Sequence, residues 1–379
     1  MDTLKRYLKT TIQSTLRRKM VFVGGPRQVG KTTLALTLLG HGATEKHPAY
    51  FNWDNPTVPS RLRRMELPDK EPLLIFDELH KYARWRNLIK GIYDTEKRFR
   101  WILVTGSARL DYYRKGGDSL ANRYRYFRLH PFSLLELNAT ASASDLALLL
   151  KYGGFPEPLL RQNERDLRLW QRDRVSRVVR EDLRDLEQVR EISLVEQLVE
   201  LLPERVGSPL SVASLREDLG VDHKTVERWL LILENLYLCF RISPYGAPKI
   251  RAVKKEKKLY LWDWSMVPEG GFRFENLVAS QLLKYCHFLE DTEGYLMELR
   301  FLRDTDKREV DFVVLKDGKP IFAVECKTGE KATSPSLNYF SERTKIPRFY
   351  QVHLGQKTYS RGNISVLPFT QFCKDLEMP

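Results

Sequence analysis

The first third of the chain alternates short apolar runs with segments of helical periodicity. Three apolar runs, at residues 21–24, 73–77 and 101–105, are each four or five residues long. Runs of this length are typical of buried strands, and helical segments between them predict a parallel α/β sheet. Further along, residues 141–202 have a mostly helical pattern. The last part, residues 263–379, combines a helix near 272–286 with strand-like runs.

These patterns predict four segments within 379 residues. We expect an α/β domain at 1–140, a helical lid or connector at 141–202, a small helical domain at 203–262 and a mixed α/β domain at 263–379. The first twenty residues mix six cations with scattered apolar residues, and no apolar run approaches the about 18 residues of a membrane helix. The four cysteines form no CxxC pair. The sequence therefore predicts a reduced, cytoplasmic protein without a membrane segment.

The charge is unevenly distributed. The chain carries 63 basic and 49 acidic side chains, a net charge of +14. Residues 1–140 hold 26 of the basic and 13 of the acidic side chains, whereas residues 263–379 hold 16 and 17. A basic surface of this kind favours a polyanionic partner such as DNA, and the excess places that partner at the first segment.

A glycine-rich loop follows the first predicted strand. Residues 25–32 match the pattern GxxxxGK[ST] and precede an apolar helix at 33–39. In this context backbone N–H groups surround phosphate oxygens, and the helix N-terminus adds positive potential. We expect Lys31 to contact the β and γ phosphates of ATP and the Thr32 hydroxyl to coordinate Mg²⁺. The predicted nucleotide-binding residues of the loop are Gly25, Pro26, Arg27, Gln28, Val29, Gly30, Lys31, Thr32 and Thr33.

Polar side chains end the next two predicted strands. Asp77 and Glu78 follow one apolar run, and Thr105 and Ser107 close the other. Because ligands bind at the carboxyl ends of parallel strands, we expect Asp77 to hold Mg²⁺ and Glu78 to polarise the attacking water. Thr105 or Ser107 is expected to sense the γ-phosphate. The alternatives are a helix-capping role for the acidic pair and a simple strand-end turn for the hydroxyls.

Residues 211–233 have the pattern helix, glycine-containing turn, helix. Asp222 is placed to cap the second helix, and Val226 and Trp229 belong to its apolar face. With the basic stretch that follows, the pair resembles a winged helix that contacts the DNA backbone. A packing module between two domains is the alternative. The cations of that stretch are Lys249, Arg251, Lys254, Lys255, Lys257 and Lys258.

Four residues of the last segment predict a second metal site. Glu275 lies in the predicted helix, and Asp311 and Glu325-x-Lys327 lie in two strands that a turn at 316–319 joins as a hairpin. Carboxylate oxygens are ligands for Mg²⁺ or Mn²⁺, and such a metal polarises a phosphodiester and activates water. We expect Lys327 to orient the nucleophile or offset developing charge. A surface pair of carboxylate and lysine without metal is the alternative.

Several stretches resemble the prokaryotic AAA+ ATPases of the archaeal-type group. They are GPRQVGKTTLA (25–35), LLIFDE (73–78), ILVTGSARL (102–110), SLANRYRYFRLHPFSLLEL (119–137) and YGGFPE (152–157). The resemblance implies ATP hydrolysis and an arginine finger that reaches the ATP of a neighbouring subunit, supplied here by Arg109 or Arg123. Family members more often have Gly-Arg where this chain has Asn122-Arg123. A homo-oligomer is therefore implied, without a subunit number.

The order Glu275, Asp311, Glu325-x-Lys327 resembles the PD-(D/E)xK, or restriction-endonuclease-like, superfamily. Members of the AAA+ group end in a domain of this type, so the resemblance covers nearly the whole chain. It implies an α/β fold class with a P-loop AAA+ parallel-sheet domain, a helical winged-helix middle and a C-terminal restriction-endonuclease-like domain. Glu275, Asp311 and Glu325 are the metal ligands that it implies. Relatives of this nuclease fold often bind without cutting.

The sequence thus predicts an ATP-hydrolysing AAA+ protein that acts on DNA and couples ATP turnover to a metal-dependent, nuclease-like domain. The predicted cofactors are ATP and Mg²⁺, with Mn²⁺ as an alternative at the nuclease-like site. The alternative function is a regulatory or signalling NTPase whose last domain is a non-cutting binding module. ATPase activity stimulated by DNA favours the first hypothesis, and activity indifferent to DNA favours the second.

Overall fold

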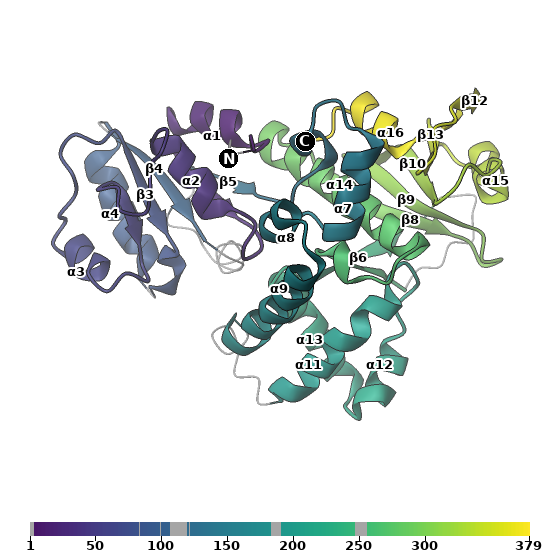
Figure 1. Cartoon of the computed structure of the whole chain (residues 1–379), viewed down its shortest axis with the longest axis horizontal. Coiled ribbons are helices and arrows are strands. Elements are labelled where there is room, and N and C mark those ends of the chain that lie inside the picture. The colour runs from purple at the N-terminus through teal and green to yellow at the C-terminus, as the bar shows by residue number, and fades with distance from the viewer. Residues whose placement is uncertain are drawn as a thin grey trace. The chain divides into compact units, whose positions relative to one another are not determined.

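The computed structural model describes residues 4–82, 84–98, 100–106, 120, 122–182, 191–246 and 256–379. Ser107, Arg109 and residues 249–255 of the predicted basic stretch lie outside the described residues. The chain forms two compact units, Met1–His130 and Pro131–Pro379 (Figure 1). Each is described by itself. The finer division at 202 and 262 stays a prediction.

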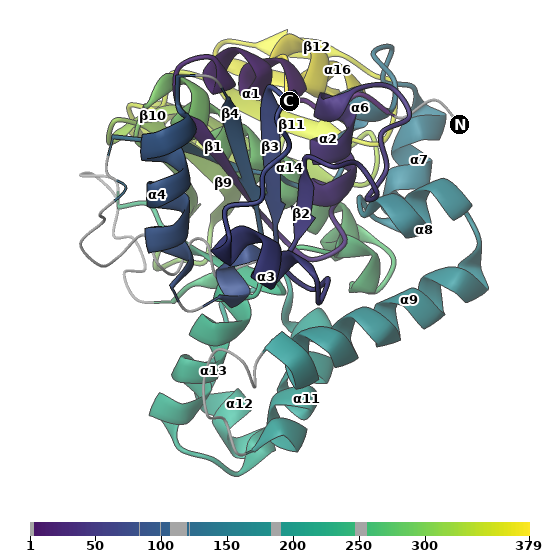
Figure 2. The same cartoon turned by 90° about the vertical axis from the view of Figure 1, so that its left-hand side faces the viewer.

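The first unit is a parallel five-stranded sheet between two layers of helices, as the apolar pattern predicted (Figures 1 and 2). The strand order is β2-β3-β4-β1-β5, and every pairing is parallel. Helices α1 and α2 cover one face and α3 and α4 the other. The elements are α1 (Lys9–Leu16), β1 (Met20–Gly24), α2 (Lys31–Leu39), β2 (Tyr50–Asn52), α3 (Val58–Arg63), β3 (Leu73–Asp77), η1 (Leu79–Lys81), α4 (Trp85–Glu96), β4 (Trp101–Thr105) and β5 (Tyr124–Arg128).

The core of this unit explains why its strands are apolar on both faces. Every residue of β1 and β3 is buried. Phe22 and Phe76 pack with Trp85 and Ile89 of α4 in one core cluster. Strand order places β1 between β4 and β5, so the loop after β1 and the ends of β3 and β4 meet at one edge of the sheet. This edge is where the sequence predicted the nucleotide.

Helices open the second unit, and the prediction of mostly helical structure at 141–202 is confirmed for its described part. Two of these helices, α12 and α13, form the predicted helix–turn–helix, with Gly220 in a left-handed conformation between them and Asp222 capping α13. The helices are α6 (Leu134–Leu137), α7 (Ala143–Tyr152), α8 (Pro156–Arg161), α9 (Glu164–Arg177), η3 (Val178–Asp182), α11 (Ile192–Leu201), η4 (Leu202–Arg205), α12 (Val212–Leu219) and α13 (His223–Asn235).

The rest of this unit is built on an eight-stranded mixed sheet with the order β12-β13-β11-β10-β9-β8-β6-β7. The predicted hairpin is confirmed as β9 and β10, and the predicted helix near 272–286 is longer, as α14. The elements are β6 (Cys239–Pro244), β7 (Lys258–Leu261), η5 (Trp264–Met266), α14 (Gly271–Glu293), β8 (Met297–Arg303), β9 (Glu309–Lys316), β10 (Lys319–Lys327), α15 (Pro335–Arg343), β11 (Phe349–His353), β12 (Tyr359–Arg361), β13 (Ile364–Pro368) and α16 (Phe369–Asp375).

Strands β6 and β7 belong to the segment 203–262, which we predicted to be separate from the α/β segment 263–379, but they lie in the sheet of that second segment. They pair with each other antiparallel, and the end of β6 continues in parallel along β8. The helix–turn–helix therefore leads directly into the sheet that carries the predicted carboxylates. Among the described residues, no helix combines the length and the apolar character that crossing a bilayer requires.

Candidate active site

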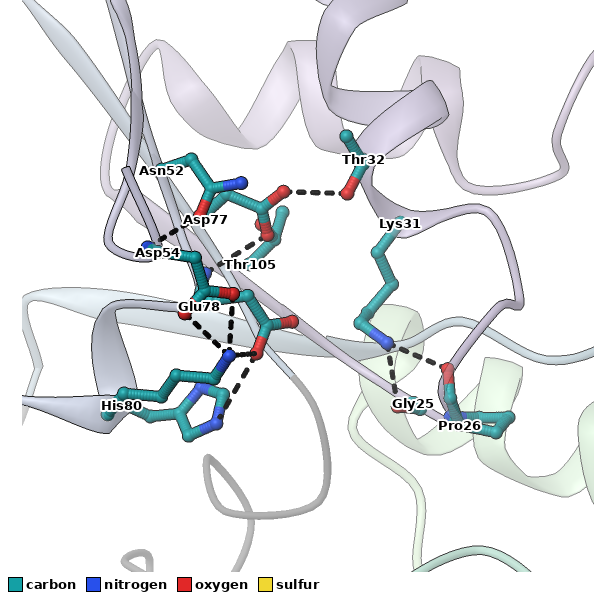
Figure 3. Close-up of polar contacts among 11 residues, drawn as sticks. Gly25, Pro26, Lys31, Thr32, Asn52, Asp54, Asp77, Glu78, His80 and Thr105 are labelled. Atoms are coloured by element: carbon teal, nitrogen blue, oxygen red, sulfur yellow. Dashed lines mark hydrogen bonds and ion pairs between the residues drawn. The ribbon is translucent and has the colours of Figure 1, made fainter. Parts of the chain in front are cut away.

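The glycine-rich loop connects the buried end of β1 to the first turn of α2. Three of its residues, Gly25, Gln28 and Gly30, have positive φ angles of 142°, 61° and 94°. Such turns direct successive N–H groups toward one point, which is the backbone arrangement that binds an anion. The Lys31 ammonium donates to the carbonyl oxygens of Gly25 and Pro26, at 3.0 and 2.7 Å (Figure 3). The lysine side chain is buried and points into the loop.

Gly25 is the position where the loop tolerates no side chain. A Cβ atom there would lie 2.3 Å from the Leu129 carbonyl oxygen, a backbone atom that cannot rotate away. We expect Gly25→Ala to lower the free energy of unfolding by about 1–3 kcal/mol, because the clash adds to an unfavourable φ. Thermal unfolding measures this.

Gly91→Ala is the matched control, since a Cβ at this residue of α4 meets nothing within 4 Å. We expect it to raise stability by about 0.5–1 kcal/mol, because alanine is the better helix former. Equal losses of stability in both variants would contradict the proposed steric cause.

Asp77 is the centre of the predicted metal site. Its Oδ2 atom accepts hydrogen bonds from the hydroxyls of Thr32 and Tyr50, each at 2.6 Å. Its Oδ1 atom accepts from the Thr105 hydroxyl and from the Glu78 N–H. The register explains this meeting, because Asp77 is paired with Thr105 on β4 and with Asn52 on β2. The structure therefore brings together three of the residues predicted for Mg²⁺ and phosphate, Thr32, Asp77 and Thr105.

Glu78 follows Asp77 in a left-handed conformation, with φ of 54°. This bend turns its carboxylate away from that of Asp77 and toward His80 and Lys81, at 3.6 and 3.9 Å (Figure 3). Burial raises the pKa of Glu78, the cations of Lys31 and Lys81 oppose this, and Asp77 adds to it. A buried carboxylate with a raised pKa is a stronger base than an exposed one, as polarising a water molecule requires.

Three functional neighbours of this site were not predicted. Tyr50 contacts Asp77 from β2, and its burial beside that carboxylate raises the pKa of the phenol. Lys81 also binds Asp54 at 2.6 Å, which links the loop after β2 to Glu78. The buried Arg6 donates to the Val29 carbonyl of the glycine-rich loop at 2.7 Å. The short apolar run 49–51 was not predicted as a strand but could have indicated β2, and only the strand order reveals that β2 lies beside β3.

Arg123, predicted as a possible arginine finger, lies far from the loop of its own chain. It precedes β5, and Met20 at the start of β1 is paired with Tyr124, whereas the loop follows the other end of β1. Five residues of strand separate the two ends by about 16 Å. Arg123 pairs with Asp94 at 3.4 Å. The predicted contact of Arg123 with the nucleotide of a neighbouring subunit stays a prediction.

The predicted carboxylates of the second unit also come together, but around a lysine. Glu275 on α14 and Asp311 on β9 lie 3.2 and 3.5 Å from the ammonium of Lys258, and Glu309 lies 2.5 Å from it. Although burial opposes it, the carboxylates raise the pKa of Lys258. The sequence assigned Lys258 to an exposed basic wing. This was wrong, because the residue begins β7 and has 0% exposed area.

Glu325 and Lys327 face the same side of β10, as predicted. The Lys327 ammonium lies 2.6 Å from Glu325 Oε1, whereas the buried Oε2 atom has no hydrogen-bond partner. Burial and the nearby Asp311 raise the pKa of Glu325, and the same two causes raise that of Glu275. The described part of the chain contains no group of three or more His, Cys, Asp or Glu side chains arranged to hold a metal ion.

Comparison with known protein families agrees with the geometry of the first unit. Residues 17–138 match the family model described as AAA domain. The first unit is therefore similar to an AAA domain, and we call it the AAA domain after this similarity. The match supports the coarser part of the predicted resemblance, a P-loop domain of the AAA+ type with a parallel sheet. Residues 143–269 and 270–372 match two families described as domains of unknown function, DUF8612 and DUF4143, which assign no chemistry to the second unit.

Two relatives of the chain are uncharacterized proteins and therefore add no functional information. The uncharacterized protein MJ1637 of Methanocaldococcus jannaschii is 22% identical, over 98% of this chain and 88% of its own length. The uncharacterized protein Rv2008c of Mycobacterium tuberculosis is 24% identical, over 85% of this chain and 72% of its own length.

Two solved structures are also similar in part. The Thermotoga maritima RuvB Holliday junction branch migration motor has a TM-score of 0.30 and 17% identity, over 62% of this chain and 87% of that chain. The Aeropyrum pernix ORC1 protein in complex with DNA has a TM-score of 0.29 and 14% identity, over 68% and 87%. These TM-scores are too low to carry a function from those proteins to this chain.

Proposed function

We propose that the AAA domain hydrolyses ATP with Mg²⁺ at the glycine-rich loop. The hydrogen bond of 2.6 Å between Thr32 and Asp77 is the observation that carries this proposal. It joins the first turn of α2 to the end of β3, and a hydroxyl and a carboxylate at this spacing are the oxygen ligands that Mg²⁺ takes in nucleotide sites. Bound Mg²⁺ supplies charge neutralisation at the β and γ phosphates.

Each side chain of the site has its own role in this proposal. Lys31 exchanges its two carbonyl contacts for phosphate oxygens, and the loop N–H groups hold the remaining phosphate charge. Glu78 orients and polarises the attacking water. Lys81 and Asp54 hold Glu78 at the end of β3. Thr105 and Tyr50 fix the orientation of the Asp77 carboxylate. ATP turnover measured with and without Mg²⁺ tests the proposal, and turnover independent of divalent metal contradicts it.

The raised pKa of Glu78 predicts the pH dependence of turnover. The base acts when deprotonated, so activity is lost as pH falls through its pKa. Because burial raises that pKa above 4.5, we expect the acid limb of kcat to lie above pH 4.5. A pH–rate profile of the wild type measures this. An acid limb below pH 4.5 would show that Glu78 is not the base.

We further propose that the AAA domain contacts nucleic acid through its N-terminal segment. Residues 3–44 contain eight basic and no acidic side chains. Arg17 and Arg18, which follow α1, are exposed. The same segment reaches the nucleotide site, because Arg6 binds the carbonyl of Val29 in the loop. Phosphate contact at α1 would therefore be linked through a short, rigid path to the ATP site.

DNA is expected to stimulate ATP turnover, and binding should weaken steeply with salt. Each lost phosphate contact reduces the slope of log K against log salt by about 0.9. We expect Arg17→Glu with Arg18→Glu to weaken DNA binding and flatten this slope. The matched control is Arg361→Glu with Lys374→Glu, two exposed cations of the second unit. An equal loss in both double variants would contradict contact through α1.

The second candidate function is a regulatory NTPase whose last domain binds without cutting. The observation that favours it is the Lys258 ammonium among the carboxylates that the sequence predicted as metal ligands. ATP turnover that is indifferent to single-stranded, duplex and branched DNA would favour this candidate. Stimulation by any of the three would favour action on DNA.

A further inference from the structure

A buried ammonium ion takes part in the carboxylate cluster of the second unit. Lys258 is fully buried, and its Nζ atom lies 2.5 Å from Glu309 Oε1, 3.2 Å from Glu275 Oε1 and 3.5 Å from Asp311 Oδ1. Three carboxylates from α14 and β9 thus converge on one cation that the chain itself supplies from β7. A buried charge persists only with such partners, so these contacts hold the lysine firmly in place.

The remaining oxygens of Asp311 and Glu309 have partners of their own, and the Glu275 oxygen that contacts Lys258 also accepts from a tyrosine. Asp311 Oδ2 accepts from the N–H of Cys326 at 2.8 Å. Arg303 binds Glu309 Oε2 at 2.8 Å. The Tyr260 hydroxyl donates to Glu275 Oε1 at 2.7 Å. Divalent ions take oxygen ligands at about 2.0–2.6 Å and several at once. The spacing around Lys258 is mostly that of hydrogen bonds to an ammonium ion.

The charges are close to balance without a metal ion. Glu275, Glu309, Asp311 and Glu325 carry at most four negative charges, whereas Lys258, Arg303 and Lys327 carry three positive charges within the same network. A divalent cation added to this set would face a fixed ammonium ion at close range. Like charges at such a distance in a buried site oppose each other strongly.

We propose that Lys258 is the resident cation of this cluster, among the carboxylates that the sequence predicted as ligands of a divalent ion, so that the second unit does not cleave nucleic acid by metal catalysis. An ammonium ion cannot act as the Lewis acid that lowers the pKa of a bound water. Lys327, the lysine of the predicted Glu-x-Lys pair on β10, is paired with Glu325. The inference concerns the second unit and holds whether or not the AAA domain hydrolyses ATP.

Removing the lysine should convert the cluster into a metal site. The experiment measures Mn²⁺ binding by the whole chain without nucleotide. Every protein compared carries Asp77→Asn, which removes the metal ligand proposed in the AAA domain. With Lys258 present, we expect no Mn²⁺ binding that depends on Asp311. In Lys258→Met, four carboxylates lose one cation, and we expect at least about tenfold tighter Mn²⁺ binding, because affinity follows ligand charge. Asp311→Asn should remove the gain.

Lys284→Met is the matched control, since Lys284 is also buried in the same unit but pairs with the carboxylate of Glu136, outside the cluster. It should gain no Mn²⁺ binding. The double variant Lys258→Met with Glu309→Gln removes one charge of each sign and keeps three carboxylates. If the single variant does not fold, the double variant tests whether loss of the lysine creates an Mn²⁺ site. Absence of a gain in both Lys258 variants would overturn the proposal.

Cleavage provides an independent readout. Wild type is incubated with single-stranded, duplex and branched DNA and Mg²⁺ or Mn²⁺, beside Asp311→Ala. We expect no metal-dependent cleavage that distinguishes the two proteins. Cleavage by wild type that Asp311→Ala abolishes would overturn the proposal, as would Asp311-dependent Mn²⁺ binding with Lys258 in place.

Discussion

Replacement of Lys31 by alanine is expected to abolish ATP turnover. The buried Lys31 ammonium donates to the carbonyls of Gly25 and Pro26, inside the loop that is proposed to surround the phosphates. Alanine removes the lysine that is proposed to contact the β and γ phosphates. Losing one such electrostatic contact typically costs about 10²- to 10³-fold in rate, and we expect a loss at or above the upper end. Phosphate release under saturating ATP measures it.

Lys70→Ala is the control for this variant, because Lys70 is an exposed lysine of the same unit. Its turnover should equal that of wild type. Circular dichroism and thermal unfolding establish that Lys31→Ala is folded. Unchanged turnover in a folded Lys31→Ala protein would place ATP hydrolysis outside this loop.

Replacement of Glu78 by glutamine should separate ATP binding from ATP hydrolysis. Glutamine keeps the size of the side chain and its contact with Lys81, but it cannot accept a proton from water. We expect kcat to fall by about 10²- to 10⁴-fold, the usual contribution of a general base. The affinity for ATP should stay close to that of wild type, because Glu78 lies beyond Thr32 and Asp77 rather than in the phosphate loop. Equilibrium titration with a fluorescent ATP analogue measures affinity, and single-turnover hydrolysis measures the chemical step.

The exposed Glu66 provides the corresponding control, and Glu66→Gln should change neither quantity. A Glu78→Gln protein that binds ATP poorly would mean that the carboxylate acts on the nucleotide rather than on water. Full-rate hydrolysis would mean that another residue activates the water.

The local part of the AAA site could be predicted from the sequence. The strand ends at Gly24, Asp77 and Thr105 follow from apolar runs whose length only a buried strand explains. The loop 25–32 is recognisable because its glycines and its lysine must stand at fixed spacing. Adjacent parallel strands then bring Asp77 and Thr105 together, as the register confirms. The roles of these residues in catalysis stay predictions.

The partners that come from distant segments could not be predicted. Tyr50 and Arg6 contact Asp77 and Val29 over separations of 27 and 23 residues, and nothing in their own neighbourhoods indicates it. The family resemblance implied that Arg123 or Arg109 reaches the ATP of a neighbouring subunit. Only the pairing of Met20 with Tyr124 shows that Arg123 lies at the end of the sheet opposite the loop of its own subunit.

Lys258 of the second unit is another residue whose partners could not be predicted from the sequence. In sequence it ends a run of cations, and a charged residue beside Lys257 is typical of a solvated loop. In the structure it begins a strand whose four residues are all buried, and carboxylates from α14 and β9 surround it. The sequence alone determined which residues are acidic, which runs are strands and which loop carries the phosphate-binding pattern, because these depend on local spacing. The tertiary structure alone decided which cation those carboxylates share, because burial and pairing depend on strands that the chain brings together from far apart.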